Sequence, residues 1–254
     1  MIRYSEKIFG LSEQILGRVA DRRRRPRIPT RAVLQSVLVL FWSRLGSLHA
    51  LEAVAGAAFW RRWLGRPTAS ADTVGRVHAL LENPGVRRGL QQVYKCLKRN
   101  KALRGVGGWG VVVLDGHEQH ASYRRHCAGC LERTVHTEGG ERIQFYHRQV
   151  SLLLLGEKFR LLLDVEPQRP GEDEVATALR LLRRVLRAYP RAFQVVAADG
   201  LYLQAPFLNF LLAKGKHALL VLKDERRDLY QDVLGLWPRI APQPGRYRSR
   251  DCLW

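Results

Sequence analysis

The spacing of hydrophobic residues divides the chain into two parts. Residues 31–104 carry apolar side chains at helical spacing and show little strand character, which predicts three or four helices. Residues 1–20 predict a further short helix, and two prolines in DRRRRPRIP (21–29) predict an irregular basic linker. Ser70 or Asp72 is expected to cap one of the helices. Breaks between the helices are expected at Gly46, at RPTAS (66–70) and at Asn83-Pro84-Gly85.

The pattern changes after RGVGGWG (104–110), a glycine-rich hinge that predicts a domain boundary. Short buried strands then alternate with amphipathic helices. Helices are expected near 172–189 and 205–213, and strands at 111–115, 143–155, 158–165, 193–199 and 217–224, the second and third strands forming a hairpin. Strands joined by helical crossovers predict a mixed sheet and an α/β fold. The expected organisation is a helical region at 1–104 and an α/β core at 109–254.

Two of the predicted strands end alike, with an aspartate and a glycine after a buried run. Asp115 closes VVVLD and Asp199 closes VVAAD, and each is followed by Gly. If these strands are parallel neighbours, both carboxylates emerge at the edge where open α/β sheets bind ligands. Two close carboxylates repel unless a cation lies between them, and oxygen ligands suit Mg²⁺ or Mn²⁺. A pair of such ions can hold the attacking and leaving oxygens of a phosphoryl transfer.

The alternative for both aspartates is ordinary Asp-Gly turn chemistry after a strand. A third strand, LLLDVE, also ends in acids, Asp164 and Glu166, but it lacks the following glycine.

Basic residues strongly outnumber acidic ones. The 43 Lys and Arg against 23 Asp and Glu give a net charge of +20 and an isoelectric point near 10.7. This balance indicates a polyanionic partner, and nucleic acid before a membrane. A GC-rich genome alone would scatter arginine, yet four are consecutive: Arg22, Arg23, Arg24 and Arg25. We expect these four to contact the phosphates of double-stranded DNA; Arg76 either reads a base edge or is a surface charge of its helix.

The hydropathy of the chain does not indicate a membrane protein or a secreted one. Residues 1–10 lack the apolar core of a signal peptide, and the longest strongly apolar run, 37–42, is too short to span a bilayer. The four cysteines do not resemble a secreted disulfide framework. We therefore expect a cytoplasmic, nucleoid-associated protein with no membrane partner.

Histidine and cysteine gather in residues 117–136. Cys127 and Cys130 have the C-x₂-C spacing of a zinc knuckle, and His126 or His120 could complete the site. A full zinc site usually shows a second spaced pair, which is not clear here, so a loop of reduced thiols is the alternative. His117, two residues after Asp115, is expected to orient water or phosphate instead.

Several stretches resemble the DDE transposases of bacterial insertion sequences. They are GSLHALE, SADTVGRV, LDGHE, HCAGCLERT, FYH, GEDEVATALRLL, VVAADGLYLQAPF and LLVLKDERR, and they cover most of the chain from about residue 30. The resemblance implies an RNase H-like catalytic core and metal-dependent DNA strand cleavage and strand transfer. It places Asp115 on the first strand and Asp199 at the end of the fourth, its parallel neighbour. The separation of 84 positions (199 minus 115) suits this group, and Asp164 falls on an edge strand away from the pair.

The family also has a third acid, a glutamate on a helix beyond the last core strand. This chain stops soon after that strand, which predicts a core that is incomplete at the C-terminus, with DNA binding but little cleavage. Glu225 and Asp232 are the alternatives for the third acid. Asp232 lies 33 positions past Asp199 (232 minus 199), similar to the shorter spacing in retroviral integrases.

Two other functions stay open at this stage. One is a non-catalytic DNA-binding remnant that inhibits an intact transposase, and the other is an RNase H-like nuclease that uses Glu225 or Asp232. The expected DNA partners are transposon ends and target, and the assembly could be a homodimer.

Overall fold

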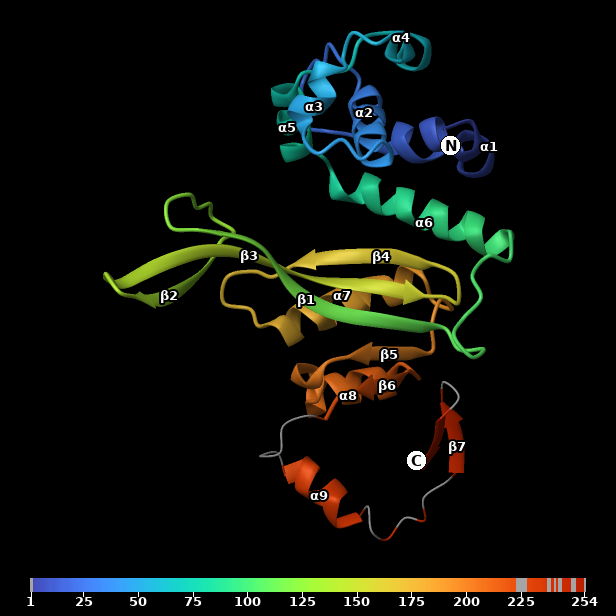
Figure 1. The fold of residues 1–254 in the computed structure, drawn as a ribbon, viewed down its shortest axis with the longest axis vertical. Coiled ribbons are helices and arrows are strands. Elements are labelled where there is room, and N and C mark those ends of the chain that lie inside the picture. The colour runs from blue at the N-terminus through green and yellow to red at the C-terminus, as the bar shows by residue number, and fades with distance from the viewer. Residues whose placement is uncertain are drawn as a thin grey trace.

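The structure, a computed structural model, describes residues 2–222, 228–236, 239, 241, 244–247 and 250–253. Short helices formed by residues 2–79 lie at one end of the molecule, and a mixed β-sheet flanked by helices lies beside them (Figure 1). The change from helices to strands falls between Arg99 and Val111, at the position of the predicted hinge.

The helical part contains more elements than its hydrophobic pattern predicts. Residues 11–18 continue from the first helix as a π-helical and a 3₁₀ turn, not as one helix. The α-helices are α1 (Ile2–Phe9), α2 (Thr30–Trp42), α3 (Leu48–Ala53), α4 (Ala58–Leu64), α5 (Ala71–Ala79) and α6 (Asn83–Arg99). The unexpected break separates α3 from α4, where the buried Trp60 indole donates a 2.8 Å hydrogen bond to the Val54 carbonyl. Ser70 caps α5 as predicted, accepting from the Thr73 amide at 3.3 Å.

The sheet has the strand order of an RNase H-like fold. Its strands are β1 (Val111–Ser122), β2 (Leu131–Thr137), β3 (Gly140–Leu155), β4 (Arg160–Pro167), β5 (Val195–Ala198) and β6 (His217–Leu220). The central order is β4-β3-β1-β5-β6, with β3 antiparallel to β1 and β4, and with β1, β5 and β6 parallel. Two helices, α7 (Glu174–Ala188) and α8 (Ala205–Ala213), provide the crossovers. The predicted α/β class, with a helical N-terminal region and an RNase H-like mixed sheet, is therefore confirmed.

One strand of this sheet was not predicted. β2 pairs antiparallel with the first half of β3, and β1 runs seven residues beyond its predicted end at Asp115. Together, residues 116–149 form a twisted extension, which we call the β-arm, that projects past α7 (Figure 1). Most β-arm residues are at least partly exposed, so its strands lack the alternation of a half-buried strand that makes strands recognisable in a sequence.

The main core lies between the sheet and α7. Leu181, Leu182 and Val185 of α7 are fully buried in one cluster with Val112 and Leu114 of β1. The acidic Glu174 in the first turn of α7 and Arg187 in its last turn match the helix dipole.

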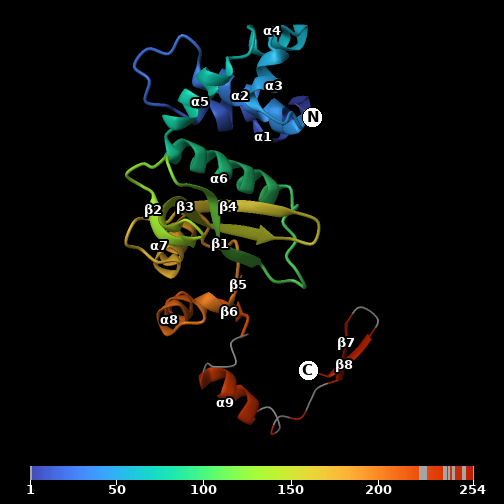
Figure 2. The same cartoon turned by 60° about the vertical axis from the view of Figure 1, so that its left-hand side comes forward.

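The helix α6 belongs to both parts of the molecule. It lies along β4 in both views (Figure 1 and Figure 2). Its Tyr94 ring makes a T-shaped contact with Tyr189 at the end of α7, with centroids 5.1 Å apart, and Arg87 bonds Asp164 on β4. The region assigned to 1–104 therefore shares its last helix with the sheet.

Beyond the sheet the described residues form α9 (Asp228–Leu236) and a hairpin of β7 (Pro244–Tyr247) and β8 (Arg250–Leu253). β6 ends at Leu220, before the predicted end at residue 224, and Glu225 lies outside the described residues. None of the helices in the described part of the chain has the length and hydropathy needed to cross a bilayer.

Candidate functional site

The two aspartates of VVVLDG and VVAADG come together just past the point where the parallel pairing of β1 with β5 ends. β1 and β5 are parallel, with Val111 opposite Val195 and Val113 opposite Ala197. Two positions further along the same register, Asp115 stands opposite Asp199. Both residues are exposed, and neither forms a salt bridge with another described residue.

The alternation of side chains places both carboxylates on the same face of the sheet. Val112, Leu114 and Val196 point into the core beneath α7 and are at most 1 % exposed. Side chains of neighbouring positions in a strand point to opposite faces, so Asp115 and Asp199 face away from α7. The backbone of Asp199 is still extended, although the strand ends at Ala198. Its side chain accepts from the Leu201 amide at 2.9 Å and so starts the 3₁₀ turn Gly200–Tyr202.

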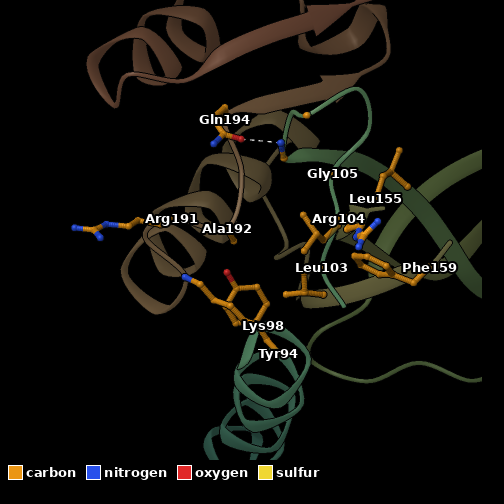
Figure 3. Close-up of a pocket in the computed structure, with 13 residues that line it drawn as sticks. Tyr94, Lys98, Leu103, Arg104, Gly105, Leu155, Phe159, Arg191, Ala192 and Gln194 are labelled. Carbon is orange, nitrogen blue, oxygen red and sulfur yellow. Dashed lines mark hydrogen bonds between the residues drawn. The ribbon is translucent and has the colours of Figure 1, made fainter. Parts of the chain in front are cut away.

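A glycine at the entry to β1 fixes this register. The Gly110 carbonyl accepts from the amides of Gln194 and Val195 at 2.8 and 3.0 Å, and its amide donates to the Gln194 side chain at 2.7 Å (Figure 3). A Cβ at Gly110 would lie 2.8 Å from the Ala192 carbonyl oxygen and 2.9 Å from Phe193 Cα. Only glycine allows the two chains to approach so closely, and the register they adopt brings the two aspartates together.

A buried polar cluster lies under the aspartates, on the α7 side. The Tyr202 hydroxyl donates to Glu174 Oε1 at 2.7 Å, and Arg148 Nη2 lies 2.8 Å from Glu174 Oε2. Burial raises the pKa of Tyr202 far above its usual value, as do its hydrogen bond to Glu174 and the negative charges of Glu174 and both aspartates. Tyr202 therefore stays a neutral hydrogen-bond donor, and it anchors the turn that follows Asp199 to the start of α7.

Glu174 also explains the glycine after Asp115. A Cβ at Gly116 would lie 2.2 Å from the Glu174 carboxyl carbon. The sequence suggests only a favourable charge in the first turn of a helix for Glu174, and no pattern in the chain marks it as a neighbour of Asp115.

Polar side chains continue along the exposed face of β1. The Gln149 amide nitrogen lies 3.0 Å from His117 Nε2, and the Ser151 hydroxyl donates to the Asp115 carbonyl at 3.4 Å. His117 is on the same face as Asp115, two positions away, where the sequence predicts a group that orients water or phosphate.

The acids of the third strand do not join this site. Asp164 and Glu166 lie on β4, at an edge of the central sheet, and are 5 and 6 % exposed. Asp164 accepts from Arg87 at 3.2 Å and from Arg184 at 2.6 Å, while Glu166 pairs with Arg180 and Arg184. These carboxylates are neutralised by arginine and hold α6 and α7 to the sheet.

The two cysteines lie beside a histidine that is not one of those predicted. Cys127 and Cys130 lie in the loop between β1 and β2, and both thiols approach His147 of β3, at 3.4 and 3.5 Å. His126 instead stacks on Phe145, with ring centroids 4.7 Å apart. His120 lies across the strand pair from His147 and outside the cluster of ligand atoms. The cluster of ligand atoms therefore contains His147, which was not predicted, because the pairing of β3 with β1 brings a histidine 17 residues from Cys130 beside the two thiols.

The consecutive arginines also differ from one another. The Arg23 guanidinium makes two 2.8 Å bonds to Asp21 and one of 3.0 Å to the Ile28 carbonyl. Arg23 is thus part of the fold of the linker, whereas Arg22, Arg24 and Arg25 are exposed. Arg76 is exposed on α5, and its Nε lies 3.4 Å from the Asp72 carbonyl.

A pocket lies at the opposite end of β1 and β5 (Figure 3). Tyr94, Leu103 and Phe159 form its apolar wall, and its charged groups are Lys98, Arg104 and Arg191. Gly110 and Gln194, which precede the two strands, also line it, so the pocket is at the amino ends of the strands. It is separate from the edge of the sheet that carries the two aspartates.

No protein-family model and no curated protein matches the chain. Among solved structures it is similar to the piggyBac transposase in a cryo-EM structure of the synaptic complex with hairpin DNA. The TM-score is 0.45 and the sequence identity 11 %, over 98 % of this chain and 54 % of that one. The chain thus spans about half the length of that protein. The strand order, not this likeness, identifies the fold.

Proposed function

We propose that this chain is a DNA transposase of the DDE type, which cleaves and joins DNA strands with Mg²⁺ or Mn²⁺. One observation carries the proposal: the register of the parallel strands β1 and β5, continued by two positions, puts Asp115 opposite Asp199 on one face of an RNase H-like sheet. Carboxyl ends of parallel strands are where α/β sheets bind ligands. The resemblance of LDGHE and VVAADGLY to insertion-sequence transposases supports the same two residues.

The chemistry of the two side chains fits a hard divalent cation. Both are exposed carboxylates without a basic partner among the described residues, and two like charges on neighbouring strands are stabilised by a cation between them. Asp115 and Asp199 would hold the ion, which supplies charge stabilisation and an activated water or 3′-hydroxyl. Tyr202 and Glu174 would keep the turn after Asp199 in place, and His117 would orient a water or phosphate oxygen.

We assign none of the described residues as the third acid of the family. Asp232 lies on α9, which both views place beyond β6 and apart from the carboxyl end of β1, and Glu225 is not described (Figure 1 and Figure 2). Glu174 is near, but it is buried on the α7 side and already engaged. A protein that binds DNA through its arginines without cutting it is therefore the second candidate function.

The experiment measures metal binding and DNA nicking on the same preparations. Mn²⁺ titration followed by electron paramagnetic resonance should give tight binding for the wild type and at least tenfold weaker binding for Asp115→Asn and Asp199→Asn. Glu138→Gln, which removes an exposed acid from the turn between β2 and β3, is the matched control. Mn²⁺-dependent nicking of supercoiled plasmid that both site variants abolish would establish the enzyme.

The same preparations distinguish the alternatives. If the protein binds DNA in a salt-sensitive manner and binds Mn²⁺ but does not nick the plasmid, we would conclude that it is a DNA-binding protein with a metal site. Mn²⁺ affinity that neither aspartate substitution changes would overturn the site and, with it, the proposed catalysis.

A further inference from the structure

We propose that Cys127, Cys130 and His147 bind a Zn²⁺ ion that fastens the loop between β1 and β2 to β3. The two sulfur atoms lie 3.7 Å apart, and His147 Nε2 lies 3.4 Å from Cys127 Sγ and 3.5 Å from Cys130 Sγ. All three potential ligand atoms fall within 4.8 Å of one another. The proposal does not depend on the transposase assignment, because these residues belong to the β-arm and not to the aspartate edge.

The three distances match the edges of a zinc tetrahedron. Zinc binds thiolate sulfur at about 2.3 Å and imidazole nitrogen at about 2.0–2.1 Å. A tetrahedral angle between such bonds gives a separation of about 3.8 Å for two sulfurs and about 3.6 Å for sulfur and nitrogen. The observed 3.7, 3.4 and 3.5 Å are close to both values.

The backbone of the loop is arranged for a pair of thiolates. The Cys130 amide donates to the Cys127 carbonyl at 3.0 Å and closes a tight turn, and the Cys127 amide donates to Cys130 Sγ at 3.2 Å. This bond places a backbone donor at a sulfur atom that would carry negative charge as a zinc ligand. Gly129 leaves room over the cluster, since a Cβ there would still be 3.9 Å from Cys127 Sγ and the His147 ring.

Hydrogen bonds among these three side chains do not explain the arrangement as well as a zinc ion does. The single lone pair of a neutral imidazole nitrogen accepts one proton, yet two thiols converge on His147 Nε2. A disulfide would need the sulfurs at about 2.05 Å and would leave the histidine without a role. Soft sulfur ligands with one imidazole select zinc over the hard cations that suit the aspartates.

Three protein ligands leave one coordination position for water or for His120. His120 is the cross-strand partner of His147, with ring centroids 5.5 Å apart. The ion would join a loop on one side of the β-arm to a central strand. It would therefore order the region where side-chain packing is weakest, because most residues there are exposed.

Zinc content and cobalt spectroscopy test the assignment. Reduced protein equilibrated with Zn²⁺ and then desalted should retain about one zinc per chain. Co²⁺ in its place should give the intense near-ultraviolet bands of sulfur ligation and the visible bands of a tetrahedral site. Cys127→Ser, Cys130→Ser and His147→Gln should each lower the zinc affinity by at least tenfold. Cys96→Ser and His136→Gln are matched controls: Cys96 is buried in α6, and His136 lies on β2 outside the cluster, facing Glu141.

Limited proteolysis gives a second readout that does not require any substitution. Arg124 and Arg125 are exposed trypsin sites in the same loop. Removing zinc with a chelator should speed cleavage there at least tenfold, while the circular dichroism of the sheet and helices stays unchanged. Reduced, folded wild-type protein that retains no zinc would overturn the proposal. So would zinc retained equally by Cys127→Ser and Cys130→Ser, or a native protein in which these two thiols are joined as a disulfide.

Discussion

At the scale of single residues, the candidate site depends on groups that have no metal chemistry of their own. Gly110 sets the register of β1 against β5, and Gly116 leaves space for Glu174. Tyr202 ties the turn after Asp199 to α7. These three residues hold the two aspartates in place, and of the three only Gly110 lies outside the motifs LDGHE and VVAADGLY.

Gly116→Ala should destabilise the fold and weaken Mn²⁺ binding together. The new methyl group would lie within 2.4 Å of the Glu174 carboxylate, so Glu174 and Tyr202 must move. We expect a loss of about 1–3 kcal/mol, as for other overpacked buried sites. Denaturant unfolding measures it, with Gly46→Ala as control, because a Cβ at Gly46 meets nothing within 4 Å. Equal stability of the two variants would contradict this account of Gly116.

Asp21→Asn should show a loss of stability that depends on pH. Hydrogen bonds from the Arg23 side chain, above all, and from Thr30 hold the pKa of Asp21 well below its usual 3.8. A lowered folded-state pKa stabilises the fold above pH 3.8, and this contribution disappears as the pH falls below that value. We therefore expect a deficit of about 1–3 kcal/mol at pH 7 that shrinks toward zero as the pH falls below 3.8.

The comparison is made by urea unfolding at several pH values. Glu138→Gln, at an exposed turn, should track the wild type at every pH. A deficit for Asp21→Asn that stays constant from pH 7 to pH 2.5 would show that charge is not the cause.

At the scale of elements, the helices and strands that pack into the core could be predicted from the sequence, but the pairing of exposed strands could not. Apolar spacing, together with Pro170 and Pro206, predicts α7 and α8. Two buried runs around a short turn predict the hairpin of β3 with β4. β2 was not predicted because it is polar and exposed. His147 lies in a predicted strand, but the sequence does not show that β3 pairs with β1 and so brings it to the cysteines. The adjacency of β1 and β5 came from the family resemblance, because two similar strand ends do not specify which strands pair.

The linker between the first helical segment and α2 should contribute to DNA binding through three arginines and not four. Changing Arg22, Arg24 and Arg25 together to Ala should reduce the slope of log affinity against log salt by about 2.7, or about 0.9 for each phosphate that is no longer neutralised. Arg23→Ala should instead lower stability, because the buried Asp21 carboxylate would lose its partner. Fluorescence anisotropy with duplex DNA at several salt concentrations measures the slope, and an unchanged slope for the triple variant would exclude the linker from the interface.

At the scale of the whole molecule, α6 is the described helix that joins the exposed arginines of the first helices to the sheet. Ion pairs link it to β4, and Tyr94 belongs to the main core. This arrangement predicts that the helical region and the sheet unfold together, and that a DNA segment bound by the linker has a fixed relation to the aspartate edge.

Arg87→Ala should loosen that connection. It removes the bonds to Asp164 and Glu166 while Arg180 and Arg184 still neutralise both acids, so we expect a cost of about 1–2 kcal/mol. Calorimetry should show the helical region melting before the sheet, and trypsin should cut residues 2–79 first. Lys95→Ala is the control, an exposed position on the same helix. A single unshifted transition for Arg87→Ala would mean that the apolar contacts of α6 suffice.

The parallel pairing of β1 with β5 also has a kinetic consequence. It joins segments 84 residues apart, and such distant pairing forms late because the closure of a long loop costs entropy before any contact repays it. The antiparallel meander of β1, β3 and β4 can assemble from nearer segments, with Asp115 alone at its edge. The two carboxylates meet only when α7 and β5 have docked. A divalent ion that needs both would therefore bind the finished fold in preference to its precursors, and its capture would mark the last step of assembly.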